Sequence, residues 1–132
     1  MINNTVSFLI LRLAIGVSMF GHGLVRLPKL DKFSGWMVKS FENSMLPASL
    51  VKPFSYALPV AEFLIGLLLI IGLFTRQSLI AGSIVMIFLI LGTTLIESWE
   101  ALVSQLIHVV FFALLLGYVT YNSYALDKLL KK

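Results

Sequence analysis

Long runs of apolar residues, separated by short polar segments, dominate the pattern along the chain. Four of these runs are close to bilayer length, at about residues 6–27, 54–74, 79–96 and 102–121. A helix needs roughly 20 apolar residues to cross the hydrocarbon core of a membrane. Backbone polar groups in lipid must also be hydrogen-bonded within the segment, which excludes open strands. The pattern therefore predicts an all-α membrane protein with four transmembrane helices.

The connections between the runs predict how the helices are arranged. Thr75-Arg76-Gln77 separates the second run from the third, and residues 97–100 separate the third from the fourth. Short connections join antiparallel neighbours. We therefore expect one domain over residues 1–132, folded as an antiparallel four-helix bundle with both termini on the same side.

The connection between the first two runs is longer, from Pro28 to Lys52. Apolar residues recur within it at helical spacing, namely Leu30, Phe33, Met37 and Phe41. Charged residues take the other positions, as in helices that lie in the membrane interface. The spacing predicts an amphipathic interfacial helix over about residues 30–43. The same pattern would also suit a helix that caps the bundle without touching lipid.

The composition supports lipid as the solvent and excludes several kinds of chemistry. Of 132 residues, 59% are hydrophobic and only 12% are charged, whereas a soluble domain has about a quarter charged. The runs leave too little chain for a separate soluble catalytic domain or a nucleotide-binding fold. Without any cysteine, thiol exchange and iron–sulfur clusters are excluded. The net charge of +4 indicates membrane topology and lipid headgroups rather than nucleic acid.

Five polar residues lie inside the apolar runs: Arg12, His22, Glu62, Gln105 and His108. An ionisable residue in a span costs at least ~2.5 kcal/mol, so it needs a partner or a function. Counting ~1.5 Å per residue from the expected helix ends places Arg12 and Glu62 at similar depth. We expect them to form a buried ion pair. The pair would either hold two helices together or take part in ligand or proton binding.

The remaining polar residues predict a cleft. Gln105 and His108 share one face of the fourth helix, and His22 lies near the end of the first helix at the long connection. With Glu62, these residues are expected to line a polar cleft that opens toward that connection and holds a quinone headgroup or another small polar ligand. A histidine could bind a quinone carbonyl and deliver a proton near neutral pH. Alternatively, His22 reaches the interface and His108 is satisfied by a backbone carbonyl.

Metal chemistry is not favoured by the same residues. A haem b held between His22 and His108 would need rings at equal depth, and the expected depths differ by roughly 6 Å. No carboxylate and histidine stand at ligand spacing on one helix, so we expect no metal site. Small residues predict close packing of helices. Gly16, Gly23 and Gly66 would let the first two helices approach closely.

Three segments together resemble the DoxX family. The run LRLAIGVSMFGHGLVRLPKL, from Leu11 to Leu30, is similar to the family's first helix, with its Leu-Arg-Leu start, His-Gly pair and basic end. The run AEFLIGLLLIIGLFTR, from Ala61 to Arg76, is similar to its second helix. The segment from Ser123 to Asp127 resembles the Ser-Leu-Asp that often closes the family. The segment from Gly117 to Tyr121 departs from the family, where many members have a Gly-x-Gly-Arg-like sequence.

The resemblance implies a small four-helix protein of the bacterial inner membrane, with Arg12, His22 and Glu62 as the positions carried over. It favours cytoplasmic termini, whereas the basic residues divide four against five between the two sides and decide nothing. One branch of the family resembles a subunit of thiosulfate:quinone oxidoreductase, and other members are implicated in redox and oxidative-stress complexes. No cysteine pair is present for a thiol relay.

These observations lead to three functional hypotheses. The first is an accessory subunit or anchor of a quinone-linked oxidoreductase, with the bilayer and a soluble or membrane redox protein as its partners. The second is a non-catalytic membrane protein of assembly or stress response. The third is a small transporter or channel, which would require a homo-oligomer because one bundle of four helices with so few polar positions makes a poor pore.

Overall fold

The structure, a computed structural model, describes residues 2–130 of the chain, and every regular element in that range is a helix. Lys131 and Lys132, which the charge count includes, lie outside the described residues. The long helices are α1 (Ile2–Arg26), α3 (Ala48–Ile71), α4 (Thr75–Leu95) and α5 (Trp99–Gly117). The shorter elements are α2 (Leu30–Ser40), α6 (Leu126–Leu130) and two 3₁₀ turns, Leu27–Lys29 and Val119–Tyr121.

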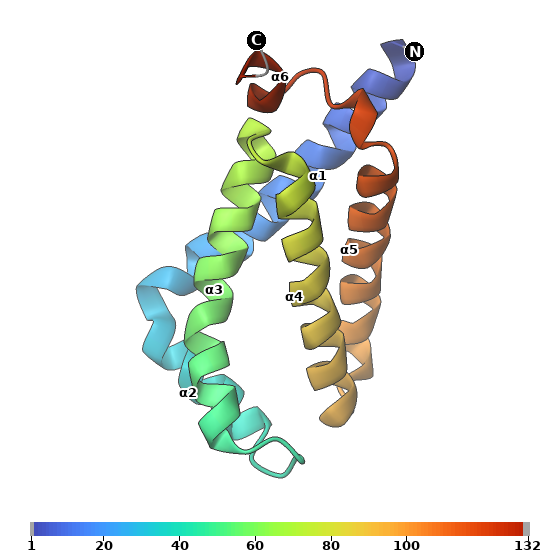
Figure 1. Ribbon diagram of the computed structural model, residues 1–132. Coiled ribbons are helices and arrows are strands. Elements are labelled where there is room, and N and C mark those ends of the chain that lie inside the picture. Colours follow the sequence, from blue (N-terminus) through green and yellow to red (C-terminus); the bar gives the residue numbers. More distant parts are fainter. Residues whose placement is uncertain (1, 131–132) are drawn as a thin grey trace.

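Four helical stretches are long and apolar enough to cross a membrane, which makes the chain a multi-pass membrane protein. They are α3, α4, α5 and the stretch Asn3–Ser40, which contains α1. Along the chain, α1 packs on α3, α3 on α4, and α4 on α5, and α5 returns to α1. Figure 1 shows both ends of the chain at one end of the bundle and α2 at the other. The predicted antiparallel bundle is confirmed.

The long connection does contain a helix. In α2, Met37 is buried against Val51 and Leu58 of α3, and Phe33 and Phe41 pack on the same cluster. The helix ends at Ser40, earlier than predicted, and these apolar side chains of α2 and of Phe41 after it cover α3. That α2 also lies in the membrane interface remains a prediction.

Three glycines bring α1 and α3 into unusually close contact. A Cβ atom on Gly66 would stand 2.1 Å from the backbone nitrogen of Phe20, and one on Gly23 would stand 2.5 Å from the nitrogen of Phe63. At Gly16 the nearest atoms of α3 would lie at 3.1 Å. Real Cβ atoms do not approach so closely, so only glycine fits at Gly66 and Gly23. The expectation that small residues draw these helices together is confirmed.

The same contacts set the register of α1 against α3. Gly16 lies level with Ile70, and Gly23 lies level with Phe63. Because the two helices are antiparallel, extending this register puts Leu24 level with Glu62. Arg12 falls level with the turn after α3.

The expected ion pair between Arg12 and Glu62 was therefore wrong. α3 begins at Ala48, six residues before the predicted start, because the carbonyl of Pro47 already accepts the amide hydrogens of Leu50 and Val51. The chain leaves α1 at Arg26 and turns into α2, so α3 extends beyond the end of α1. Counting depth from Pro53 consequently misplaced Glu62 by several residues, or roughly 10 Å at the rise of a helix.

Arg12 instead joins a polar cluster at the terminal end of the bundle, which we call the terminal clamp. Its Nη1 donates a hydrogen bond to Oδ1 of Asn122 at 2.6 Å, and its Nη2 donates to the carbonyl of Tyr124 at 2.9 Å. Nδ2 of Asn122 in turn donates to Oγ1 of Thr75 at 3.0 Å. A buried arginine thus ties the segment after α5 to the first turn of α4.

Asp127 completes the terminal clamp and fixes the turn between α3 and α4 at a different position from the one predicted. The turn falls at residues 72–74 rather than at Thr75-Arg76-Gln77, because α4 already begins at Thr75. The carboxylate of Asp127 accepts hydrogen bonds from the backbone nitrogens of Phe74 at 2.7 Å and Thr75 at 2.8 Å. The first amide groups of a helix lack acceptors within the helix. Here Asp127, 52 positions from Thr75 in the sequence, supplies the acceptor.

Replacing Gly66 by Ala should destabilise the bundle strongly, because the new methyl group would overlap the backbone of Phe20. Overpacking of this kind costs about 1–3 kcal/mol or more. The free energy of unfolding, measured by detergent denaturation in mixed micelles, checks the change. Gly21→Ala is the matched control on α1, since a Cβ there meets nothing within 4 Å. Equal stability of the two variants would contradict the packing described here.

Replacing Asp127 by Ala should remove the two acceptors at the start of α4. Loss of a helix cap costs about 0.5–2 kcal/mol, and the thermal unfolding midpoint should fall accordingly. Ser123→Ala, an exposed change in the same segment, should leave the midpoint unchanged. If both variants unfold at the wild-type temperature, the carboxylate does not cap α4 in solution.

Candidate functional site

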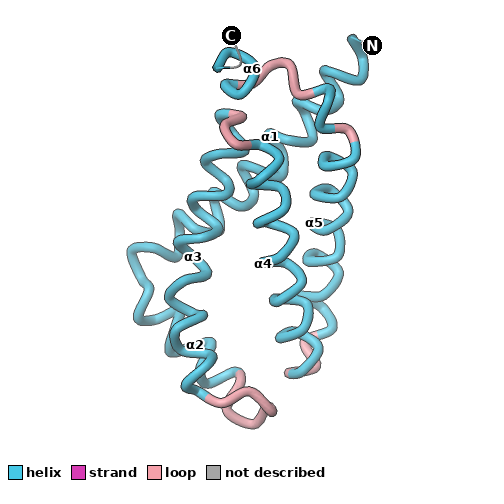
Figure 2. The backbone as a smooth tube through the Cα atoms, viewed as in Figure 1, coloured by secondary structure: helices cyan, strands magenta, loops and turns pink. Residues whose placement is uncertain are grey.

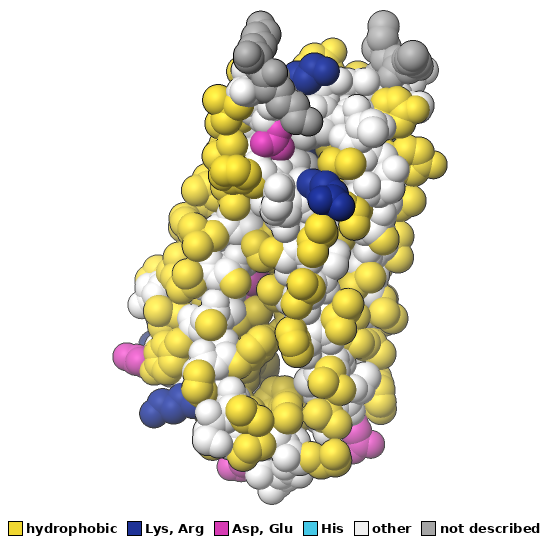
Figure 3. Space-filling view, in the orientation of Figure 1, with side chains coloured by type: hydrophobic (Ala, Val, Ile, Leu, Met, Phe, Trp, Pro, Cys, Tyr) yellow, Lys and Arg dark blue, Asp and Glu magenta, His cyan; other side chains and the backbone are white. Residues whose placement is uncertain are grey.

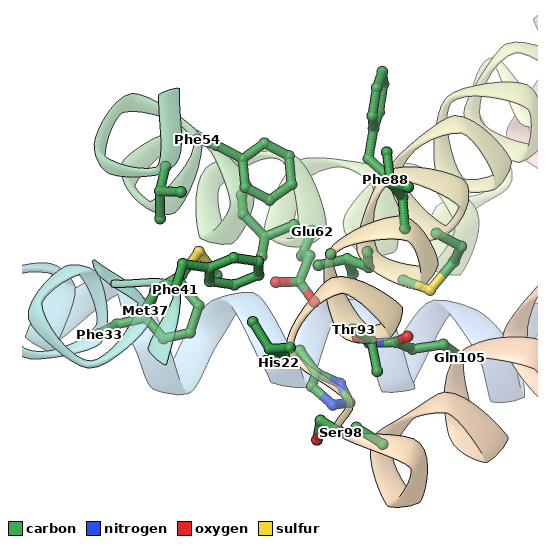
Figure 4. A pocket seen from close by; sticks show the side chains of 18 of the residues that line it. His22, Phe33, Met37, Phe41, Phe54, Glu62, Phe88, Thr93, Ser98 and Gln105 are labelled. Carbon is green, nitrogen blue, oxygen red and sulfur yellow. The ribbon is translucent and has the colours of Figure 1, made fainter. Parts of the chain in front are cut away.

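A cavity of about 540 Å³ lies in the half of the bundle that carries α2, between the four long helices. This volume falls within the usual range of about 300–1,000 Å³ for small-molecule sites. All four residues predicted to line a cleft do line this cavity: His22 of α1, Glu62 of α3, and Gln105 and His108 of α5. Figure 4 shows His22, Glu62 and Gln105 directed into a common space from three different helices.

Glu62 is the buried anion of the cavity, and its partner is Arg26. Nη1 of Arg26 lies 2.8 Å from Oε1 of Glu62. The register of α1 on α3 explains this pairing, since Leu24 is level with Glu62 and Arg26 follows two residues later. The guanidinium also lies over the ring of Phe33 from α2, at 4.6 Å from the ring centroid. A cation over an aromatic face is favourable, so the ion pair also connects α2 to the wall of the cavity.

The sequence reasoning missed Arg26 as a site residue. It treated this arginine as the basic end of the first helix and as a charge for topology. One signal was available, because Arg26 follows His22 by four residues and so lies on the same face of α1. The depth estimate nevertheless assigned Glu62 to Arg12, and that assignment removed the need for a second cation.

The two histidines are held in defined orientations by backbone carbonyls. Nδ1 of His22 lies 2.6 Å from the carbonyl of Ser18, and Nδ1 of His108 lies 2.7 Å from the carbonyl of Ser104. Because a carbonyl only accepts, both Nδ1 atoms carry the proton, and Nε2 of each neutral ring is an acceptor. Nε2 of His108 lies 2.9 Å from the hydroxyl of Ser18. The alternative expected for His108, a ring satisfied by a carbonyl, is therefore what the structure shows.

This hydrogen bonding bears on haem and metal chemistry. The rings of His22 and His108 meet edge to face with centroids 6.1 Å apart. The Nε2 atom of His108 is engaged by Ser18 and its Nδ1 by a carbonyl, so neither nitrogen is left for an axial bond. Within residues 2–130, no group of three or more His, Cys, Asp or Glu side chains could hold a metal ion.

Gln105 differs from the other polar groups because its oxygen has no partner. Its Oε1 atom is buried and makes no hydrogen bond, although the residue lines the cavity. An unpaired buried polar group costs about 1–3 kcal/mol. An amide at the wall of a cavity can regain that energy by binding a polar atom of a ligand. Gln105 is therefore a lining residue whose hydrogen bonding the described residues leave incomplete.

Most of the remaining wall is apolar. α2 supplies Phe33 and Met37, α3 supplies Phe54 and Leu58, and α4 supplies Met86. Apart from Thr93 of α4, the buried polar groups lie on the side formed by α1, α5 and Glu62. The cavity thus suits a molecule with a compact hydrogen-bonding group at one end and an apolar body.

Comparisons with known proteins agree with the fold. The model of the family described as DoxX matches residues 7–99, about seven tenths of the chain. The matched region contains Arg12, His22, Arg26 and Glu62 but ends before Gln105 and His108. Neither the curated proteins nor the solved structures give a significant match.

A double-mutant cycle should separate the observed ion pair from the one expected from depth. Arg26→Met leaves the Glu62 carboxylate buried without its cation, which should cost about 1–3 kcal/mol of unfolding free energy. The cost is lower than for a fully buried pair because the Arg26 side chain is 28% exposed. Adding Glu62→Leu should recover part of this loss. Detergent denaturation gives the coupling energy.

The control cycle combines Arg12→Met with Glu62→Leu. Because Arg12 lies in the terminal clamp, the two effects should add within about 0.5 kcal/mol. Coupling between Arg12 and Glu62, with none between Arg26 and Glu62, would contradict the structure.

Proposed function

We propose, for a chain that belongs to the DoxX family, that it is a membrane subunit or anchor of a redox complex and binds the headgroup of a quinone in its cavity. The observation that supports this proposal is that hydrogen-bonding side chains from three helices converge on one largely apolar cavity. Pockets of this kind, apolar with a few convergent polar groups, are typical of small-molecule sites.

A quinone headgroup needs donors for two carbonyl oxygens on opposite sides of a flat ring. Arg26 can donate from its guanidinium while keeping Glu62, since a guanidinium carries five N–H groups. Gln105 can donate from its amide nitrogen, and its unpaired oxygen can accept from a quinol hydroxyl. Donors on α1 and α5 therefore face the same space and can hold the two ends of the ring.

His22 supplies the proton chemistry. Its ring lines the cavity, is exposed, and within residues 2–130 donates one hydrogen bond, from Nδ1 to a carbonyl of its own helix. The Nε2 atom can take a proton from the exposed side and pass it to a reduced carbonyl oxygen, because an imidazole nitrogen with a free lone pair can accept a proton and then donate it. Reduction of a quinone to a quinol takes up two electrons and two protons. The chain has no cysteine, so we assign the electrons to the redox group of a partner protein.

The partner and the membrane belong to the same proposal. A quinone pool and a multi-pass fold are consistent with the bacterial inner membrane that the family resemblance implies. Cytoplasmic termini would place the cavity in the outer half of that membrane, on the side of α2. The partner would then contact the chain near α2 or from within the bilayer.

Two substitutions should weaken quinone binding without loss of the fold. Gln105→Leu removes an amide whose oxygen has no partner, and His22→Ala removes an exposed ring whose hydrogen bond is to a carbonyl of its own helix. Each should raise the dissociation constant about tenfold, the effect of losing roughly 1.4 kcal/mol of ligand hydrogen bonding. Trp36 lines the cavity and Trp99 does not, so quenching of Trp36 fluorescence in a Trp99→Phe background measures the binding.

Ser83→Ala is the matched control, since its hydroxyl bonds the carbonyl of Leu79 within α4 and does not line the cavity. Native mass spectrometry of gently extracted protein should also detect a bound quinone. Binding that is unchanged in both cavity variants, with wild-type unfolding temperatures, would exclude the cavity as the quinone site.

A further inference from the structure

We infer that the cavity opens sideways into the lipid between α3 and α4, and that its ligand is a neutral-headed amphiphile whose apolar tail lies in this opening. The inference rests on the proposed function and extends it, because it specifies the chemical class of the whole ligand and its route. We call the opening the α3–α4 portal, and its rim residues are Leu50, Phe54, Phe88 and Leu91.

The portal follows from how α3 is held. The turn at residues 72–74 keeps α3 and α4 together at the terminal end, and the backbone nitrogen of Asp127 donates to the carbonyl of Gly72 in this turn. Toward the other end, α3 is held to α1 by Gly23 and Gly66 and is covered by α2. Figure 2 shows α3 and α4 close together at the turn and separating toward the end that carries α2. The separation leaves a gap that side chains fill only in part.

The rim residues show where the cavity reaches the surface. Leu50 of α3 is 62% exposed, and Phe88 and Leu91 of α4 are 57% and 53% exposed, yet all three line the cavity. Lining a cavity while exposing more than half of the surface is expected of residues near an opening, and Trp36 of α2, which is 61% exposed, shares this property. Figure 3 shows a hollow with apolar side chains around it between α3 and α4, in the half near α2.

Polarity changes from the mouth to the interior. All four rim residues are apolar, whereas Glu62 and Thr93, which also line the cavity, are only 2% and 7% exposed. In Figure 4, Phe54 and Phe88 stand on opposite sides of the cavity, with Glu62 between them. A ligand placed along this gradient has its polar group inside the bundle and its apolar part at the lipid.

The position of the mouth selects the class of ligand. α3 and α4 are candidate membrane spans, so the portal faces hydrocarbon, which a water-soluble compound would have to cross first. Burial of an alkyl chain contributes about 0.8 kcal/mol for each methylene group. A tail that partitions into the membrane and lies in the portal therefore adds affinity that a bare headgroup lacks.

The charges in the cavity select the headgroup. Arg26 and Glu62 neutralise each other, and their pairing leaves no unmatched cation on this wall for a phosphate. A phospholipid headgroup would bring a second anion to the guanidinium that already neutralises the buried carboxylate of Glu62, and an uncompensated buried charge is costly. A neutral head with carbonyl or hydroxyl groups keeps the pair intact. The occupant is therefore a neutral, long-tailed molecule such as an isoprenoid or alkyl quinone.

A second rim of the cavity is polar and gives a rival route. His22 and Ser104 line the cavity between α1 and α5 and are also exposed. We assign this rim to protons and water, because a tail placed there would cover polar side chains. The two rims make the inference testable, since each can be blocked separately.

The absence of cysteine from the chain allows each rim to be blocked by one introduced thiol. Leu91→Cys, modified with a bulky maleimide in membranes, places a plug in the α3–α4 portal. Two probes are compared, a dimethoxy-methyl-benzoquinone without a side chain and its decyl-substituted analogue. Modification should weaken binding of the decyl compound about tenfold or more and change binding of the tail-less compound less than about twofold.

Ile87→Cys is the matched control, because this residue is 59% exposed on α4 but does not line the cavity. Its modification should affect neither probe. Ser104→Cys tests the polar rim, and its modification should leave the decyl compound bound. Occupancy by the decyl compound should also slow the modification of Leu91→Cys but not that of Ile87→Cys.

Three outcomes would overturn the inference. The portal is wrong if modification at Ser104→Cys, rather than at Leu91→Cys, displaces the decyl compound, or if modification at Leu91→Cys affects both probes equally. The neutral headgroup is wrong if an anionic phospholipid in the vesicles competes with the decyl compound at equal amounts. If neither probe binds unmodified wild-type protein, the proposed quinone site itself fails. If both probes bind and the plug has no effect on either, the quinone site stands and the portal alone is wrong.

Discussion

The close packing of α1 on α3 is the constraint on which the rest of the structure depends. Gly66 meets the backbone of Phe20 and Gly23 meets that of Phe63, with no space for a methyl group. Two helices interlocked at the level of their backbones cannot slide by a residue without a clash. Their register therefore decides which charge meets which, and it places Glu62 beside Arg26 rather than Arg12. In lipid, where apolar burial does not draw helices together, such packing is a main source of association.

The cavity is a consequence of the same constraint. α3 is held to α1 and α2 along the half that contains Glu62, while the short turn at residues 72–74 keeps α3 and α4 together at the opposite end. α3 and α4 are in contact near their turn and separate beyond it, and the cavity extends into the space between them. The two ends of the bundle thus have different roles, since one is closed by Arg12 and Asp127 and the other carries the groups that can bind a ligand.

Few ionisable side chains are buried in the described part of the bundle. Each of the buried ionisable groups, Arg12 and Glu62, has partners brought by distant parts of the chain, from the segment after α5 in one case and from the end of α1 in the other. Gln105 and His22 are different, because the fold leaves hydrogen-bonding capacity on them beside the cavity. Position beside the cavity distinguishes Gln105 and His22 from Arg12, whose Nε atom is also buried without a partner among the described residues but lies in the terminal clamp.

The amino-acid sequence by itself determined the membrane fold, the four spans, the helix in the long connection, the glycine contacts and four polar residues around the cavity, but not Arg26. These follow from local rules, since span length, helical period and small-residue spacing depend on neighbours along the chain. Only the tertiary structure decided the partners of Arg12 and Glu62, the position of the turn before Thr75 and the portal between α3 and α4. Each of these depends on where one helix stops relative to another, and an error of a few residues at a helix end moves a side chain by more than the reach of an ion pair. Asp127 shows the limit most clearly, because a carboxylate near the C-terminus fixes the start of a helix 52 residues earlier.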